Sequence, residues 1–274
     1  MSLAPLYLKA AVGAVGPRSS TLPDTELVRG ATTVDRAHLA EYARVCGFRN
    51  SDALPPTYPH LLAFGLQVEL MAGRDFPLPL PGLVHVGNSI TVHRRIDAAE
   101  QLRVAVHAER FTGHPRGAQV DLVAAVDVEG ERVWDGRSTY LARGAHAPAA
   151  GEARTAPAEI ADGPVSAVWR VAGDTGRRYA AVSGDVNPIH LHPLTARAFG
   201  FPRAIAHGMW TAARALAALQ GRLSEALTYD VAFGRPLLLP STVRLRTRRT
   251  GDGWGVDVHG TKGTHLTATV LPTS

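Results

Sequence analysis

The sequence has little cysteine and no long apolar run, and each absence excludes a class of protein. Cys46 is the only cysteine among 274 residues, so an internal disulfide framework is impossible and a reducing, cytoplasmic location is expected. No uninterrupted apolar run reaches the length of about 18 residues that a membrane-spanning helix needs. Residues 1–16 carry Lys9 as their only charge and are interrupted by proline and glycines, which makes them a poor signal peptide.

The segment 179–190 places a carboxyl group, a carboxamide and an imidazole close together, at Asp185, Asn187 and His190. Gly184 opens backbone angles that other residues avoid, and a proline disfavours the helical conformation at the residue before it, here Asn187. We therefore expect a turn in place of regular structure. A turn can bring Asp185 and His190 together, although their spacing would separate them on a continuous helix.

Three interpretations of this turn are open. Asp185 and His190 could hold one water and transfer protons, because imidazole titrates near neutral pH. Asp185 and Asn187 could instead only cap the turn through hydrogen bonds to the backbone. A metal site at His190-x-His192 is the least favoured interpretation, because Cys46 is distant and no carboxylate at helical spacing supplies a third ligand.

The next informative feature is the stretch of strong helix formers at 208–220, which predicts a helix that begins near Gly208. Its only polar residues are Thr211, Arg214 and Gln220, so the helix is expected to be buried. The first N–H groups of a helix lack internal partners and lie at its positive end, and glycine lets a ligand approach them. The helix start therefore suits an oxyanion, unless the glycine serves packing alone.

Together these residues resemble a known family. Tyr-x-x-x-Ser-Gly-Asp-x-Asn-Pro-Ile-His, ending at His190, precedes a short helix and then Ala-His-Gly-Met at the start of the apolar helix. Residues 169–272, which contain this order, resemble the MaoC-like (R)-specific enoyl-CoA hydratases and 3-hydroxyacyl-thioester dehydratases. The resemblance implies reversible hydration of trans-2-enoyl thioesters to (R)-3-hydroxyacyl thioesters. It implies no metal and no other cofactor, with coenzyme A or acyl carrier protein as the carrier of the acyl group.

The resemblance also implies roles for single residues. Asp185 and His190 would be the catalytic dyad that holds the water, and the Gly208 N–H would polarise the thioester carbonyl. His60 begins the corresponding helix of the other half, and we expect it to line the acyl tunnel. The predicted substrate-binding residues are Ser183, Asn187, His207, Met209 and His60.

The fold class that we expect is α+β, a double hotdog of two repeats, each with a long central helix wrapped by an antiparallel sheet. The chain exceeds a common domain size of about 100–150 residues, and its second half weakly repeats the element order of the first. We place the N-terminal repeat at 1–144, a linker at 145–163 and the catalytic repeat at 164–274. The predicted helices are 58–71 and 208–220, and the predicted strands are 83–93, 101–109, 118–128, 131–141, 241–249, 254–259 and 264–270.

The N-terminal repeat has no Gly-Asp-x-Asn-Pro motif, and it has His60 where the second repeat has Gly208. We expect it to be non-catalytic and to accommodate the acyl chain, which leaves one site per chain in this pseudo-dimer. A homodimer of the whole chain is a further expectation. His85, His93 and His107 fall on different predicted strands, so we do not expect them to form a second site.

The net charge of +5 raises the question of an anionic partner. Arg244, Arg246 and Arg248 alternate along a predicted strand, so they share one face. That face could contact the phosphates of coenzyme A or an acidic carrier protein, or it could simply be solvated. No aromatic residues or binding motif accompany the arginines, so nucleic acid is not an expected partner.

Two other functions compete with hydration. A hotdog thioesterase would use a similar helix start but direct water to C1 of the acyl group, and the Asp185–His190 pair argues against it. A non-catalytic acyl-binding protein would need neither side chain for its role.

Overall fold

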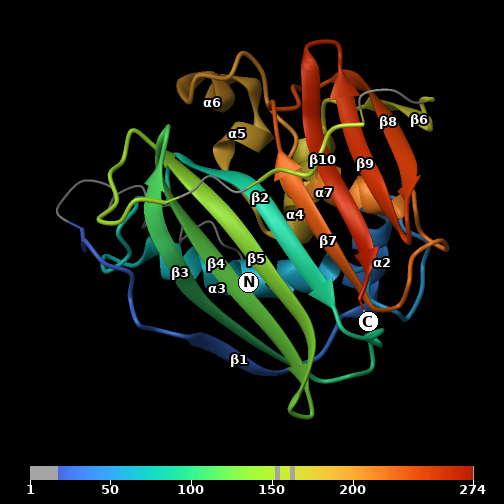
Figure 1. Cartoon of the computed structure of the whole chain (residues 1–274), viewed down its shortest axis with the longest axis horizontal. Helices are drawn as coiled ribbons and strands as arrows, with labels where there is room; N and C mark the ends of the chain where they lie inside the picture. The colour runs from blue at the N-terminus through green and yellow to red at the C-terminus, as the bar shows by residue number, and fades with distance from the viewer. Residues whose placement is uncertain (1–17, 152–154, 161–163, 274) are drawn as a thin grey trace.

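Strands from both halves of the chain form one antiparallel sheet. The computed structural model describes residues 18–151, 155–160 and 164–273, so the signal-peptide prediction and parts of the predicted linker lie outside the described residues. Within these described residues the order of the ten strands is β1-β3-β4-β5-β2-β7-β10-β9-β8-β6. Figure 1 shows β2 in teal and β3, β4 and β5 in green, beside β7 to β10 in orange and red.

The strand bounds confirm the predicted strands, which shift by a few residues at their ends. In the first half the strands are β1 Leu27–Thr32, β2 Leu83–Val92, β3 Leu102–His114, β4 Gly117–Val128 and β5 Glu131–Arg143. In the second half they are β6 Ala167–Val171, β7 Leu227–Phe233, β8 Ser241–Thr250, β9 Gly253–Gly260 and β10 Gly263–Pro272. Among these predicted strands the largest difference is in β3, which continues to His114 because a register shift near Arg110 lets its pairing with β4 resume. β1, β6 and β7 are additional strands.

The two halves meet where β2 pairs with β7, from Gly87 opposite Ala232 to Val92 opposite Leu227. Outward from this seam the first half runs β2, β5, β4, β3, β1, and the second runs β7, β10, β9, β8, β6. Each half therefore places its strands in the same order, as expected for two related repeats. The arrangement confirms the predicted α+β double hotdog.

Helices lie on one face of this sheet, and two of them are the predicted central helices, α3 and α7. The helices are α2 Arg36–Cys46, α3 Tyr58–Ala72, α4 Thr175–Ser183, α5 Pro188–Leu191, α6 Pro193–Ala198 and α7 Gly208–Ala217. α7 begins at the predicted residue but ends earlier, before a turn that contains Gly221 at a φ of 86°. None of the helices among the described residues is long and apolar enough to cross a membrane.

The segment 179–190 is more regular than the predicted turn. Tyr179 to Ser183 form the end of α4, which Gly184 terminates with a φ of 73°. α5 then begins at Pro188, whose fixed φ suits the first position of a helix. The turn is therefore restricted to 184–187, and the helices on both sides fix its position.

Candidate active site

Asp185 lies in the turn between α4 and α5, and hydrogen bonds to Ser183 and Asn187 hold it on both sides. Its N–H donates to the Ser183 hydroxyl at 3.2 Å, and its carboxylate accepts the Asn187 N–H at 3.2 Å. Asn187 also caps α5 by accepting the Ile189 N–H at 3.4 Å. The predicted capping of the turn by Asp185 and Asn187 is therefore confirmed, and it does not exclude a catalytic role for Asp185. Substrate contacts of Ser183 and Asn187 stay a prediction.

His190 is buried in α5 with one ring nitrogen committed to the backbone. Its Nδ1 lies 2.9 Å from the Ile205 carbonyl oxygen. A carbonyl only accepts, so Nδ1 carries the proton and Nε2 keeps a lone pair. Burial lowers the pKa of His190, although the negative charge of Asp185 acts in the opposite direction. His190 is therefore a neutral imidazole whose Nε2 can accept a proton.

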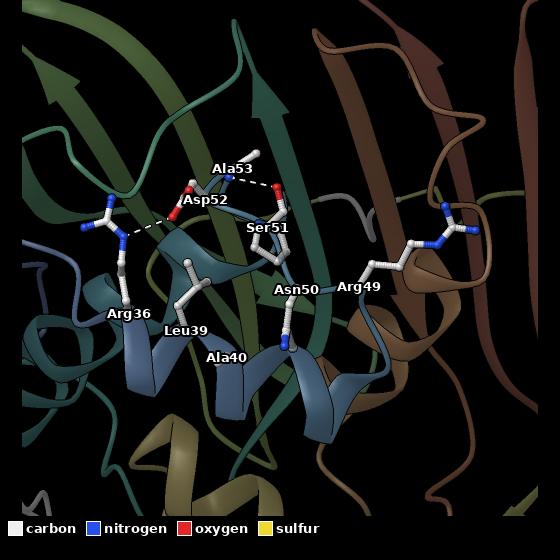
Figure 2. A pocket seen from close by; sticks show the side chains of 10 residues that line it. Arg36, Leu39, Ala40, Arg49, Asn50, Ser51, Asp52 and Ala53 are labelled. Atoms are coloured by element: carbon white, nitrogen blue, oxygen red, sulfur yellow. Dashed lines mark hydrogen bonds and ion pairs between the residues drawn. The ribbon is translucent and has the colours of Figure 1, made fainter.

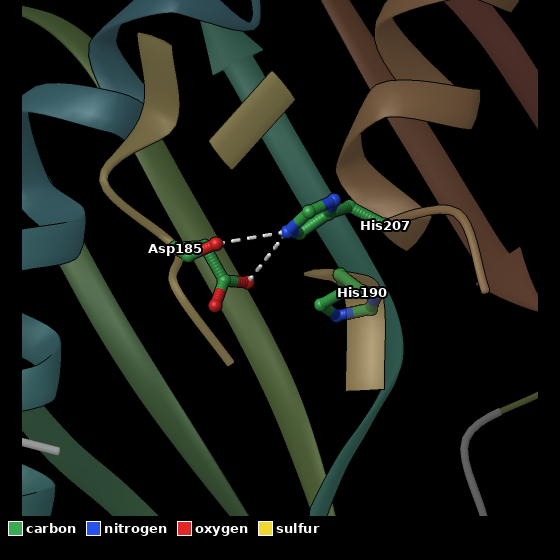
Figure 3. Close-up of side chains that lie close together, drawn as sticks. All are labelled: Asp185, His190 and His207. Atoms are coloured by element: carbon green, nitrogen blue, oxygen red, sulfur yellow. Dashed lines mark hydrogen bonds and ion pairs between the residues drawn. The ribbon is translucent and has the colours of Figure 1, made fainter. Parts of the chain in front are cut away.

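His207 connects the turn to the start of α7. Its Nε2–H donates to the Asp185 carbonyl oxygen at 3.0 Å, and the same nitrogen is 3.7 Å from a carboxylate oxygen of Asp185. Its ring stacks on His190 with centroids 3.6 Å apart. Burial, assisted by His190, lowers the pKa of His207 to about 3. Figure 3 shows Asp185, His190 and His207 gathered from three separate segments.

Gly208 is the first residue of α7, and the side chain of the preceding His207 does not cap the helix. A Cβ atom at position 208 would lie 3.0 Å from the ring of Phe233. Packing therefore favours glycine, because the Phe233 ring would have to shift to accept a side chain here. Binding of an oxyanion by the Gly208 N–H stays a prediction. The two interpretations of this glycine are compatible.

The first half contributes side chains to the surroundings of Asp185. His60 is buried on α3, and its ring lies 6.1 Å from that of His85 on β2. His85 in turn packs 4.7 Å from Tyr140 and 5.0 Å from Phe233. Burial lowers the pKa of His60 to about 4, against the charge of Asp185. Sequence reasoning placed His60 near the site but missed His85 and Tyr140, because no local pattern relates these strands to the motif.

A second contact between the halves holds α4, and no sequence pattern indicates it. The Nε2–H of His38, on α2, donates to the Val182 carbonyl in the last turn of α4 at 2.8 Å. Its Nδ1 lies 2.9 Å from the Tyr58 hydroxyl, which donates to it. His38 thus fixes the helix end from which the Asp185 turn starts.

The other predicted residues lie in different surroundings. Met209 is buried in the core, so its substrate contact stays a prediction. His192 caps α6 by accepting the Leu194 N–H at 3.2 Å. His93 and His107 pair with Asp135 and Glu109, so the histidines of the first half do not form a second cluster with His85.

The arginine stripe lies on the outer face of the sheet. Val243 and Leu245, which alternate with the arginines along β8, are buried in the core. Arg244, Arg246 and Arg248 therefore point away from the helices and from Asp185. Arg246 also donates to the Ile160 carbonyl at 3.3 Å. Contact of this stripe with the phosphates of a thioester bound at Asp185 is not supported by its position.

Asp185, His190 and His207 are also the only group of potential metal ligands found among the described residues, with ligand atoms within 4.8 Å of one another. The two rings are stacked at 27° to one another, so their lone pairs lie in two separate, nearly parallel planes and are poorly placed to converge on one ion. One nitrogen of each ring already binds a backbone carbonyl. The arrangement therefore fits proton transfer better than metal binding.

A surface cavity of about 320 Å³ lies beside α2, away from these residues. Figure 2 shows Arg36 paired with Asp52 at 3.0 Å, and the Ala53 N–H bound to the Ser51 hydroxyl. None of the candidate site residues lines it. The cavity is therefore not part of the candidate site.

Comparison of the chain with known proteins identifies its family. Residues 156–270 match the family described as MaoC like domain. The chain is 40% identical to 3-hydroxyacyl-thioester dehydratase X of Mycobacterium tuberculosis over 268 residues, which is 96% of this chain and 95% of that protein. The chain belongs to the MaoC-like family.

Solved structures agree with the family assignment. The crystal structure of HtdX of Mycobacterium tuberculosis has a TM-score of 0.81 and 38% identity, covering 91% of this chain and 100% of that chain. A MaoC-like dehydratase from Phytophthora capsici, at 18% identity, shares the fold with a TM-score of 0.72 over 92% of this chain and 96% of that chain. The MaoC-like match covers the half of the chain that holds Asp185, His190 and Gly208.

Proposed function

We propose that this MaoC-like protein is a hydro-lyase that reversibly hydrates trans-2-enoyl thioesters to (R)-3-hydroxyacyl thioesters. The observation that carries the proposal is the meeting of Asp185, a neutral His190 and the uncapped start of α7 at one place. Similarity to a protein named 3-hydroxyacyl-thioester dehydratase X supports the same reaction class. The R configuration rests on the family resemblance.

The hydration step follows from these groups. A water bound between Asp185 and His190 gives a proton to Nε2 of His190 while its oxygen forms a bond to C3. The π electrons of the C2–C3 bond move toward the thioester oxygen. The proton that His190 took from the water is then delivered to C2 as these electrons return, which restores the neutral imidazole. The negative charge that develops on the thioester oxygen is stabilised by the Gly208 N–H and the start of α7, an effect of about 3–4 kcal/mol in comparable sites.

The remaining parts of the proposal concern the carrier and the first half. The thioester itself acidifies C2, so the residues supply placement and proton transfer and no metal or other cofactor is required. The acyl group would arrive on coenzyme A or acyl carrier protein. The repeat at 1–144 would accommodate the acyl chain, with His60 near its entrance, and the linker at 145–163 would lead to the catalytic repeat. We also propose a cytoplasmic location.

The test is incubation with crotonyl-CoA and longer trans-2-enoyl-CoAs while the enoyl-thioester absorbance is followed. We expect the absorbance to fall with the wild type, because the enoyl thioester is hydrated. We expect Asp185→Asn and His190→Ala to lose almost all activity. His192→Ala is the matched control, because this imidazole lies two residues away and only caps α6. If the wild type is inert on every chain length, as coenzyme A and as carrier-protein thioesters, the proposal fails. Release of free thiol would indicate a thioesterase instead.

A further inference from the structure

Polar side chains are buried between α3 and the inner face of the sheet. Asn88 on β2 and Ser138 on β5 are 0% and 1% exposed, and the Asn88 amide donates to the Ser138 hydroxyl at 2.9 Å. Tyr140 lies two residues from Ser138 on the same face of β5, and its ring packs 4.7 Å from that of His85. Burial, together with the charge of Asp185, raises the pKa of Tyr140. We call Asn88, Ser138 and Tyr140 the polar strip. It leads from the neighbourhood of Asp185 into the first half.

Gln67 on α3 adds a second, independent observation. It is 1% exposed, and neither its Oε1 nor its Nε2 has a hydrogen-bond partner among the described residues. Buried polar side chains are nearly always hydrogen-bonded, because an unpartnered amide loses the bonds that it makes to water. The Gln67 amide therefore needs a hydrogen-bonding partner from a bound molecule.

The periodicity of α3 shows where Gln67 points. The solvent side of the helix is marked by exposed Glu69 and half-buried Leu62 and Gly65. Gln67 and His60 are two turns apart and lie on the opposite stripe, which faces the sheet. Figure 1 shows α3 crossing behind β3, β4 and β5. His60 packs beside His85 in the surroundings of Asp185, so Gln67 lies about 10 Å farther along the same stripe.

We propose that Gln67 recognises a hydrogen-bonding oxygen, a hydroxyl or keto group, carried by the acyl chain beyond C3. The inference rests on the proposed function and names its substrate class as oxygenated acyl thioesters. An amide can donate to a keto oxygen and can donate to or accept from a hydroxyl, so both groups satisfy it. A plain hydrocarbon chain in this place would leave Gln67 unpaired, and a site built for a hydroxyl discriminates strongly against the analogue without it.

The test compares kcat/KM for trans-2-enoyl-CoAs of equal length, one plain and the others hydroxylated at successive positions. We expect the wild type to prefer one hydroxyl position by about ten- to a hundredfold. Gln67→Leu should abolish this preference and accept the plain chain better. Gln119→Leu is the matched control, because Gln119 is a buried glutamine on the outer face of β4 that binds Thr112, and it should keep the preference.

Two further measurements distinguish failure of the proposed hydration from failure of the proposed recognition by Gln67. Crotonyl-CoA is too short to reach Gln67, so equal turnover by wild type and Gln67→Leu shows that the candidate site is intact. Calorimetric binding of saturated acyl-CoAs with and without the hydroxyl tests recognition even if no hydration occurs. The inference is overturned if the wild type shows no preferred position in either assay, or if Gln67→Leu keeps the preference. In both cases a buried water, not the acyl chain, satisfies the amide.

Discussion

At the scale of single residues, His207 is tied to Asp185 more closely than its predicted role implies. The sequence pattern made it a substrate-binding residue, whereas the structure shows it donating to the Asp185 carbonyl and stacking on His190. It therefore positions both members of the predicted dyad. Loss of its hydrogen bond would leave the Asp185 turn less fixed without removing either catalytic side chain.

The first prediction concerns this hydrogen bond. His207→Phe keeps an aromatic ring against His190 but cannot donate to Asp185. We expect kcat to fall by about ten- to a hundredfold, because the bond contributes about 1–3 kcal/mol in a buried site, while KM changes little. Steady-state kinetics on crotonyl-CoA measures both constants. A rise in KM at unchanged kcat would instead indicate that His207 contacts the substrate.

The second prediction concerns the close contact between Gly208 and Phe233. Gly208→Ala would force the new Cβ against the ring, and overpacking of this kind costs about 1–3 kcal/mol. Phe233→Leu alone should cost less, and the double variant should recover stability relative to Gly208→Ala. Chemical denaturation of the three variants gives the coupling free energy. Additive effects would show that the ring does not restrict position 208.

At the scale of elements, α2 is a helix that the sequence pattern did not indicate. Its caps are recognisable afterwards, since Asp35 accepts the Ala37 and His38 N–H groups and Gly47 follows with a φ of 82°. What makes α2 functionally relevant is its contact with α4 through His38. That contact joins helices more than a hundred residues apart, and no spacing in the sequence encodes it.

The third prediction tests whether α2 positions α4. His38→Leu removes the donor to Val182, and we expect kcat to fall severalfold as the end of α4 loosens. His38→Gln keeps a donor and an acceptor and should restore much of the rate. Tyr58→Phe is the matched control, because it leaves the His38–Val182 bond in place and should change kcat little. Equal kcat losses in all three variants, in proportion to lost stability, would show that α2 only contributes to folding.

At the scale of the whole molecule, the seam between β2 and β7 creates the surroundings of the site. α3 and α7 lie on the same side of the sheet, and His60 and Phe233 meet His85 there from opposite halves. His60, His190 and His207 are buried near this seam, and burial lowers the pKa of each, which couples the pH dependence of folding to the candidate site.

The fourth prediction concerns this coupling. The pKa of His60 is about 4 in the folded chain against an ordinary value of 6.5, so between these pH values the unfolded chain binds a proton that the folded chain does not. Stability must therefore fall as pH drops from about 7 to 5, by about 2 kcal/mol for His60 alone. Denaturant unfolding at both pH values should show a smaller loss in His60→Leu. An unchanged loss would mean that His60 becomes protonated in the folded chain near its ordinary pKa.

The sequence alone determined the repeated α+β fold, the family, the start of α7 at Gly208 and the turn that carries Asp185. These features depend on local backbone preferences and on hydrophobic periodicity, which a short segment contains in full. Only the tertiary structure placed His207 on Asp185, His38 on Val182, and the arginine stripe on the face opposite the site. Such contacts are set by strand pairing and helix packing between distant segments, so they exist only once the two halves share one sheet.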